Sequence, residues 1–108
     1  QGADGQPQVQ LQLHVDMIDF GLDIQQALEQ PRFLSGRIGL TEPRDPLHVE
    51  GRISEETISE LAARGHKMNV WPAWQNRAGQ AHGIVIDPET GTLSGGSDPR
   101  SDGAAIGY

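Results

Sequence analysis

The chain has no cysteine and few basic residues, and both shortages exclude classes of protein. Without cysteine it can form neither disulfides nor thiolate metal sites, and neither an oxidising nor a reducing compartment is favoured. Eight Lys and Arg stand against 15 Asp and Glu, which gives a net charge of −7, and the basic residues are scattered singly. We therefore expect neither a nucleic-acid partner nor binding to an anionic membrane surface, because both need clustered basic residues.

Large apolar residues are also scarce. Leu, Ile, Val and Phe make up about a fifth of the chain, which is low for a self-sufficient core and close to the composition of disordered chains. Fourteen Gly and seven Pro also disfavour a large regular core. No apolar run is long enough to cross a bilayer. A chain of 108 residues with this composition predicts one small domain whose core is completed by another segment.

The first residues, QGADGQPQ (1–8), have neither the basic region nor the apolar region of a signal peptide, and they lack an initiator Met. We therefore expect the chain to be a processed product or a piece of a longer protein.

The segment QVQLQLHVDM (8–17) carries two conflicting signals. Its strict alternation of apolar and polar residues favours a half-buried strand. On a helical wheel, however, the apolar residues fall on two faces, one with Val9, Leu13, Met17 and Phe20 and the other with Leu11, Val15 and Ile18. Such a helix would lie between two layers. From these residues alone, strand and helix both stay open.

Two later segments have clear helix signals. In DIQQALEQ (23–30), Asp23 and Gln26 form a capping-box pattern, and Pro31 ends the helix. In ISEETISELAARG (53–65), Ser54 is the predicted N-cap and Gly65 the residue after the last turn. The second helix has a predicted buried stripe, formed by Ile58, Leu61 and Ala62.

The remaining elements are predicted strands over 47–51, 67–71, 80–87 and 92–96, the last two joined by the turn DPETG. Residues 31–46 are expected to be irregular or extended. The order of elements predicts an α+β fold with an antiparallel sheet and packed helices.

The polar residues form no complete catalytic pattern. No two of the histidines (His14, His48, His66, His82) have metal-ligand spacing, so structural roles are favoured. Glu55, Glu56 and Glu60 belong to one solvent-facing helix, which makes a general-acid pair an unfavoured alternative, and Ser54 is a cap rather than a nucleophile. No nucleophile elbow, phosphate-binding loop or dinucleotide motif occurs, and no cofactor is expected.

Two pairs of side chains allow both a binding and a structural interpretation. Trp71 and Trp74 could line a pocket, although covering a sheet edge and a loop is favoured. Arg32 and Arg100 each follow a proline, in QPRF and DPRS. We expect both arginines to tie loops together through carbonyl and carboxylate groups rather than to bind a substrate.

Four stretches, in order along the whole chain, resemble the γ-glutamyltranspeptidase family: GADGQPQVQLQLHVDMIDFGLDIQQA (2–27), QALEQPRF (26–33), ARGHKMNVW (63–71) and GIVIDPETGTLSGGSDPRSDGAAIGY (83–108). The ending SDPRSDGAAIGY is the most specific of them. The resemblance is to the C-terminal part of the small, catalytic subunit, so residues 1–108 form one segment of it. It implies part of the N-terminal-nucleophile hydrolase fold (αββα), with helix over 7–20.

In that family a precursor cuts itself, and a new N-terminal Thr attacks a γ-glutamyl amide. The resemblance places that nucleophile upstream of Gln1, so this chain contains none. It places the oxyanion-hole backbone N–H groups on Gly2 and Ala3, where Ala3 stands at a position that is Gly in the family. The implied partners are the remainder of the small subunit and the large subunit, with a γ-glutamyl small molecule as substrate.

Three hypotheses follow. The chain is an inactive fragment of a γ-glutamyltransferase-like enzyme, a fragment of a same-fold acylase that cleaves a glutaryl-type group, or a free-standing interaction domain. The small core disfavours the third, because exposed apolar faces would drive self-association. We expect the isolated chain to be a dimer or larger.

Overall fold

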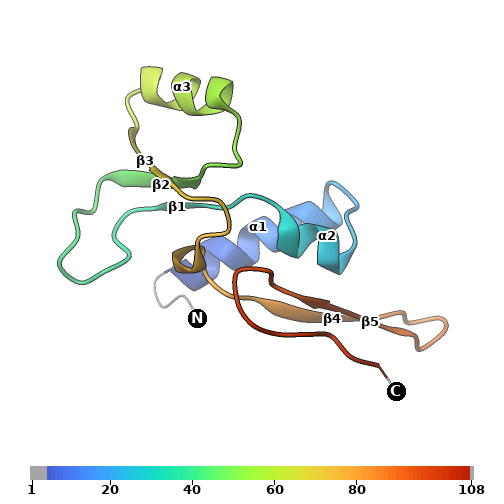
Figure 1. Ribbon diagram of the computed structural model, residues 1–108. Helices are drawn as coiled ribbons and strands as arrows, with labels where there is room; N and C mark the ends of the chain where they lie inside the picture. Colours follow the sequence, from blue (N-terminus) through green and yellow to red (C-terminus); the bar gives the residue numbers. More distant parts are fainter. Residues whose placement is uncertain (1–4, 108) are drawn as a thin grey trace.

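The structure, a computed structural model, describes residues 5–107. Helices come first and a hairpin last along the chain (Figure 1). The elements are α1 (Gln6–Ile18), α2 (Ile24–Glu29), β1 (Phe33–Ser35), β2 (Pro46–Glu50), α3 (Glu55–Ala63), β3 (Lys67–Trp71), the short 3-10 helix η2 (Asn76–Ala78), β4 (His82–Ile86) and β5 (Leu93–Ser97). The predicted helices and strands are all present, and β1 lies in the segment expected to be irregular or extended.

The strands form two separate sheets. β1, β2 and β3 make one sheet, and β4 and β5 form an antiparallel hairpin. The expected antiparallel pairing holds for this hairpin and for β1–β2, where Leu34 pairs with His48. β2 and β3 are instead parallel, with Val49 opposite Val70. The reason is that α3 lies between them in the chain, and a helical crossover returns the next strand to the starting end of the sheet.

The first helix spans residues 6–18 against the expected 7–20, so the helical alternative is correct and the strand signal is overruled. Val9 is buried and packs with the partly buried Leu13. On the opposite face, Leu11 and Ile18 are 64% and 75% exposed. Within residues 5–107, α1 is therefore covered on one face only, not on the two that were expected.

The second helix begins with the predicted capping box, in which Asp23 and Gln26 each bond the other's backbone N–H. It lies on the hairpin where Gly83 and Gly96 pair across the strands. A Cβ on Gly83 would lie 2.6 Å from Cδ1 of Ile24, so the side chains of α2 fill the space that these glycines leave. The two glycines allow the helix and the hairpin to approach closely.

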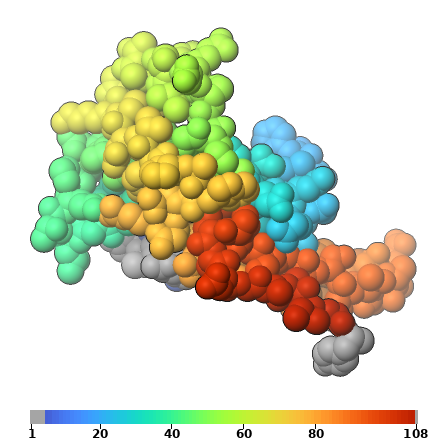
Figure 2. Space-filling model, viewed as in Figure 1, coloured from blue at the N-terminus to red at the C-terminus, as the bar shows by residue number. Residues whose placement is uncertain are grey.

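The third helix has the predicted ends but not the predicted burial. Ser54 accepts a bond from the backbone N–H of Thr57, and Gly65 has a φ of +97°, a conformation that favours glycine. Ile58 and Leu61 are only half-buried, and no residue of α3 is fully buried. The helix stands apart at the top of the molecule in Figures 1 and 2, where no second layer covers it.

The core is small and the surface is large. Its buried apolar cluster is Val9, Leu34, Trp71 and Ala78. The accessible surface is 7232 Å², against about 5,900 Å² for a compact monomer of this mass. The radius of gyration is 15.3 Å, against about 13 Å for a compact domain. The β4–β5 hairpin contributes to this extra accessible surface, because it projects from the rest of the molecule (Figure 2). Its Ile84, Ile86 and Leu93 are 65–70% exposed.

Candidate functional site

The proposed oxyanion residues Gly2 and Ala3 lie outside the described residues. The described chain starts at Gly5, the N-cap of α1, which as a glycine has no side chain to cap the helix. A Cβ on Gly5 would lie 3.4 Å from Cδ1 of Leu34, so the start of α1 packs directly against β1. The candidate catalytic segment therefore precedes, in the sequence, a helix whose N-cap lies beside the side chain of Leu34.

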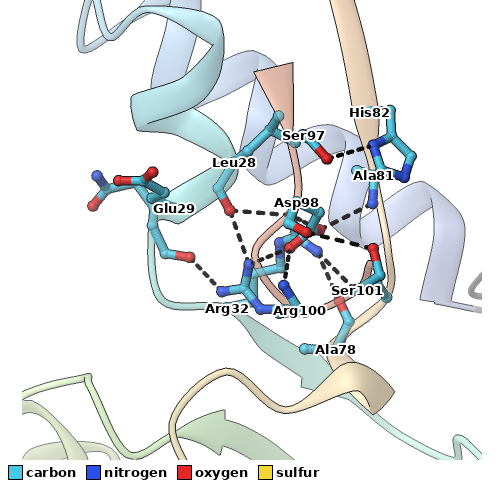
Figure 3. A network of polar contacts seen from close by, with 12 residues as sticks. Leu28, Glu29, Arg32, Ala78, Ala81, His82, Ser97, Asp98, Arg100 and Ser101 are labelled. Atoms are coloured by element: carbon cyan, nitrogen blue, oxygen red, sulfur yellow. Dashed lines mark hydrogen bonds and ion pairs between the residues drawn. The ribbon is translucent and has the colours of Figure 1, made fainter. Parts of the chain in front are cut away.

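Four buried charged residues form a cluster, and Figure 3 shows three of them, Arg32, Asp98 and Arg100, with their polar contacts. Its members are Arg32, Glu50, Asp98 and Arg100, each at most 6% exposed. They come from the segment after α2, the end of β2 and the turn after β5. The two cations and two anions balance, so the cluster has no net charge.

Arg100 uses all five guanidinium N–H groups, the full donor inventory of that side chain. Its Nε and Nη2 donate to the two carboxylate oxygens of Glu50, at 2.7 and 2.5 Å. Its remaining donors reach the Leu28 carbonyl at 2.8 Å, the Gln30 carbonyl at 2.8 Å and Asp98 Oδ1 at 3.1 Å. Arg100 thus joins the end of α2, the end of β2 and its own turn.

Arg32 ties a second set of segments. Its Nη1 donates to the carbonyls of Ala78 and Gly79, at 3.2 and 3.1 Å, and its Nη2 lies 2.7 Å from Asp98 Oδ2. Both arginines therefore hold loops through carbonyls and carboxylates, and this prediction is confirmed. These contacts hold the turn SDPRS in place, whereas Ile106, near the end of the chain, is 83% exposed.

The carboxylates of the cluster are saturated as acceptors. Glu50 accepts two bonds from Arg100 and one each from the backbone N–H groups of Arg32 and Gln75. Burial acts to raise its pKa, but the bonds from Arg100 and the backbone outweigh burial and hold the pKa below its usual value. The pKa of Asp98 is lowered in the same way: burial acts to raise it, but the N–H groups of Arg100 and Ala81 and the charges of the two arginines together outweigh burial.

This geometry suits a structural role. A general acid or base needs a pKa near the working pH and access to a substrate. Glu50 and Asp98 instead stay ionised, buried and fully bonded. Glu50 is the member that the sequence interpretation missed. The signal for it was an acidic residue that ends the short strand LHVE directly after the apolar Val49.

The tryptophans cover structure rather than line a pocket. Trp71 is buried in β3 and stacks on His48 with 4.8 Å between ring centroids. Trp74 lies over the guanidinium of Arg52, 3.4 Å from its carbon, and 5.4 Å from that of Arg100. Neither tryptophan lines the two open grooves of about 550 and 1080 Å³ beside the hairpin. The favoured interpretation of both residues is therefore supported.

The histidine contacts are structural as well. His48 bonds the Gly36 carbonyl at 2.9 Å and the Asn69 side chain at 2.8 Å. His14 bonds the carbonyl of Gln10 in its own helix at 2.7 Å. Residues 5–107 contain no group of three potential metal ligands, and no helix among them is long and apolar enough to cross a membrane.

Three glutamines hold helices to strand backbone, and the sequence interpretation missed them too. The side chain of Gln8 bonds the N–H and the carbonyl of Ser35, at 2.8 and 3.0 Å. Gln12 does the same to Phe33, at 3.1 and 2.8 Å. In the same way, Gln25 of α2 bonds both backbone groups of Ser97 in β5. We call these contacts the amide pairs.

Comparison with known proteins decides the family. A sequence model of the family described as gamma-glutamyltranspeptidase matches residues 1–108. The chain belongs to the γ-glutamyltranspeptidase family. Among curated relatives, this γ-glutamyltranspeptidase-family chain is 44% identical over 107 residues to the glutathione hydrolase-like YwrD proenzyme of Bacillus subtilis (strain 168), covering 99% of the chain and 20% of the relative.

A second relative has a different named substrate. The oxamate amidohydrolase proenzyme of Klebsiella pneumoniae subsp. pneumoniae is 40% identical over 107 residues, with the same coverage of 99% of the chain and 20% of the relative. The chain thus spans about a fifth of the length of these curated relatives. Both relatives are named as proenzymes of hydrolases.

Solved structures confirm the fold. The cephalosporin acylase from Bacillus halodurans matches with a TM-score of 0.76 and 33% identity, over 94% of this chain and 18% of the acylase. An acivicin-inhibited γ-glutamyltranspeptidase matches with a TM-score of 0.70 at 24% identity, over 87% of this chain and 47% of that one. The γ-glutamyltranspeptidase-family chain therefore has the expected α+β architecture, as part of the N-terminal-nucleophile hydrolase fold.

Proposed function

We propose that the chain is the C-terminal part of the small, catalytic subunit of a γ-glutamyltransferase-like enzyme that acts on glutathione-type substrates. The observation that carries this proposal is the family match over residues 1–108 in a chain that spans 20% of its hydrolase relative. The large exposed surface supports it, because the faces of α1, α3 and the hairpin are left for other segments to cover. Those segments are the rest of the small subunit and the large subunit.

The proposed reaction proceeds through an acyl-enzyme. A Thr upstream of this chain, made N-terminal by self-cleavage, attacks the γ-glutamyl amide carbonyl through its Oγ, and its α-amine accepts the hydroxyl proton. The C–N bond then breaks, and the amine leaves with that proton. Water or an acceptor amine takes the γ-glutamyl group from the Thr. The backbone N–H groups of Gly2 and Ala3 stabilise the oxyanion, and one such donor typically contributes about 10²–10³-fold to kcat.

In this proposal the described residues form the scaffold of the reaction. The buried charge cluster fixes the turn of residues 98–101 against the end of α2, Arg32 and β2, and α1 follows the oxyanion segment in the sequence. The isolated chain is inactive because it lacks the nucleophile.

The test uses the whole protein and a γ-glutamyl anilide, with release of the aniline as the readout. We expect turnover by the whole protein and none by residues 1–108 alone. Ala3→Pro removes the backbone N–H, so its kcat is expected to fall about 10²-fold below that of Ala3→Gly, which keeps the N–H. Equal kcat values for these two variants would overturn the oxyanion assignment, and an inactive whole protein would overturn the enzyme proposal.

A second candidate function is that of a same-fold acylase, which the 33% identity to the cephalosporin acylase favours. A glutaryl anilide separates the two, because it differs from the γ-glutamyl anilide only by the α-ammonium group. A γ-glutamyl-specific site bonds that charged group, which corresponds to about a 10- to 150-fold preference in kcat/KM. A preference for the glutaryl compound would identify the acylase.

A further inference from the structure

β1 is the edge strand of its sheet, and the two glutamines of α1 occupy its free side. Toward β2, the carbonyl of Arg32 accepts the N–H of Glu50, and the N–H of Gly36 donates to Pro46. Residues 33 and 35 therefore direct their backbone groups away from β2. The amide pairs of Gln8 and Gln12 bond the N–H and the carbonyl of each of these two residues. The glutamines thus take the place that a neighbouring strand would have.

Apolar packing by itself fixes the position of α1 on the sheet only weakly. Val9 is its one fully buried residue within the described part of the chain. Apolar contacts are non-directional, so they resist sliding along the sheet weakly. The amide pairs are directional, and Gln8 and Gln12 lie one helical turn apart on the same face. A slip of one residue along the helix axis, about 1.5 Å, would break every one of these bonds.

We propose that Gln8 and Gln12 are positioning residues for catalysis, which fix the start of α1 and through it the backbone N–H groups of Gly2 and Ala3. This inference rests on the proposed function. Gly5, two residues after Ala3, is the N-cap of α1 and lies beside Leu34 of the same strand, because a Cβ added to it would be 3.4 Å from Leu34 Cδ1. The register of α1 on β1 therefore sets where the preceding backbone leaves the scaffold.

The expected effect follows from the geometry that an oxyanion hole needs. Its donors must lie within hydrogen-bond distance of the developing oxyanion, and a misplacement of about 1 Å can lower the rate about 10²-fold. Gln12→Met keeps the length of the side chain and removes both bonds to Phe33. We expect kcat to fall about 10- to 100-fold, with KM nearly unchanged, because the oxyanion forms only in the transition state.

Gln25 provides the matched control. Its amide pair with Ser97 has the same chemistry, but it holds α2 to β5, and within residues 5–107 no hydrogen bond of the Gln25 side chain reaches α1 or β1. Gln25→Met should lower thermal stability to a similar degree and leave kcat within about threefold of the unsubstituted protein. Gln10→Met is a second control on α1 itself, because the side chain of Gln10 makes none of the hydrogen bonds found within residues 5–107.

The experiment measures kcat, KM and thermal unfolding of the whole protein with the γ-glutamyl anilide, or with the glutaryl anilide if that is the better substrate. A selective loss of kcat in Gln12→Met and Gln8→Met supports the inference. Equal losses of kcat in Gln12→Met and Gln25→Met overturn it, since the glutamines would then act through stability alone. Should Gln12→Met fail to fold, Gln8→Met carries the test with the Gln12 pair intact.

The design separates this inference from the proposed function. An inactive unsubstituted protein overturns the proposed function, and a fully active Ala3→Pro variant overturns the oxyanion assignment. Either result also overturns the positioning role, which rests on both. The positioning role alone is overturned by a different pair of results: Ala3→Pro loses turnover, and Gln12→Met and Gln25→Met lower kcat equally.

Discussion

Replacing Arg100 by lysine tests the role of the buried charge cluster, because it keeps the charge and removes the fork of donors. Arg100 is 6% exposed, and its five N–H groups bond Glu50, Asp98 and the carbonyls of Leu28 and Gln30. A lysine has three donors on a single nitrogen and cannot reach acceptors in these separate directions.

The size of the effect follows from the hydrogen bonds that are lost. The guanidinium bonds five oxygens and an ammonium has three donors, so at least two of these bonds are lost in Arg100→Lys, and each buried hydrogen bond to a charged group contributes about 1–3 kcal/mol. We expect the free energy of unfolding to fall by about 2–4 kcal/mol. Arg100→Met also removes the charge, leaving the buried carboxylates of Glu50 and Asp98 with Arg32 and with Arg52, whose Nη2 is 3.8 Å from Glu50, and should cost about 3–5 kcal/mol. Either loss is a large part of the total stability of a small domain, about 5–15 kcal/mol.

The assay is urea unfolding of the 108-residue chain, followed by tryptophan fluorescence. Trp74 lies 5.4 Å from the Arg100 guanidinium and Trp71 lies in the buried core, so both report on this region. With a slope of about 2 kcal/mol per M, a loss of 3 kcal/mol moves the midpoint by about 1.5 M. Far-UV circular dichroism checks that the helices unfold in the same transition.

Arg64→Lys is the matched control. Arg64 pairs with Glu60 on α3, and the two side chains are 68% and 62% exposed. An exposed pair of this kind contributes about 0–0.5 kcal/mol, so the urea midpoint should barely move. If Arg100→Lys shifted the midpoint as little as Arg64→Lys does, the cluster would not hold the fold together and the reasoning would be refuted.

Two further predictions concern the isolated chain. Sedimentation velocity should show a dimer or larger species, because its 7232 Å² surface exceeds that of a compact monomer by about 1,300 Å²; a clean monomer at micromolar concentration would contradict this. Acid should destabilise the chain, because the pKa values of Glu50 and Asp98 are lowered in the folded state. Their contribution is therefore fully present above the unfolded pKa values, about 4, and is lost as the pH falls through the folded values. The urea midpoint should be constant from pH 7 to 5 and fall below pH 4, in contrast to Asp98→Asn, whose midpoint should be lower at pH 7 and change less below pH 4.

The local parts of the fold were predictable because their causes lie within a few residues. Asp23 and Gln26 form a capping box, Ser54 caps α3, and Gly65 ends it with a positive φ. Each of these interactions closes within one helical turn. The fold class followed from the order of the elements together with the family resemblance, and the loop-tying role of Arg100 from its place beside a proline.

Other features depend on residues far apart in the chain. The alternation of residues 8–17 favoured a strand, yet this segment is a helix whose glutamines bond β1. The parallel pairing of β2 and β3 was signalled by the strand–helix–strand order, but the antiparallel interpretation took the neighbouring strands as a meander. The predicted burial of Ile58, Leu61 and Ala62 on α3 was too high. Their spacing indicates an apolar helix face, but it does not show whether another layer covers that face.

The sequence by itself determined the helix ends, the turns and the family, because these rest on local chemistry and on motifs in order. Only the tertiary structure showed that Glu50, 50 residues before Arg100, supplies the carboxylate for its guanidinium fork. Only the structure showed that Gln8 and Gln12 complete an edge strand 21 to 27 residues away. The physical reason is that buried charges and strand edges take whichever partners the packed chain brings within bonding distance, and spacing along the sequence does not record that distance.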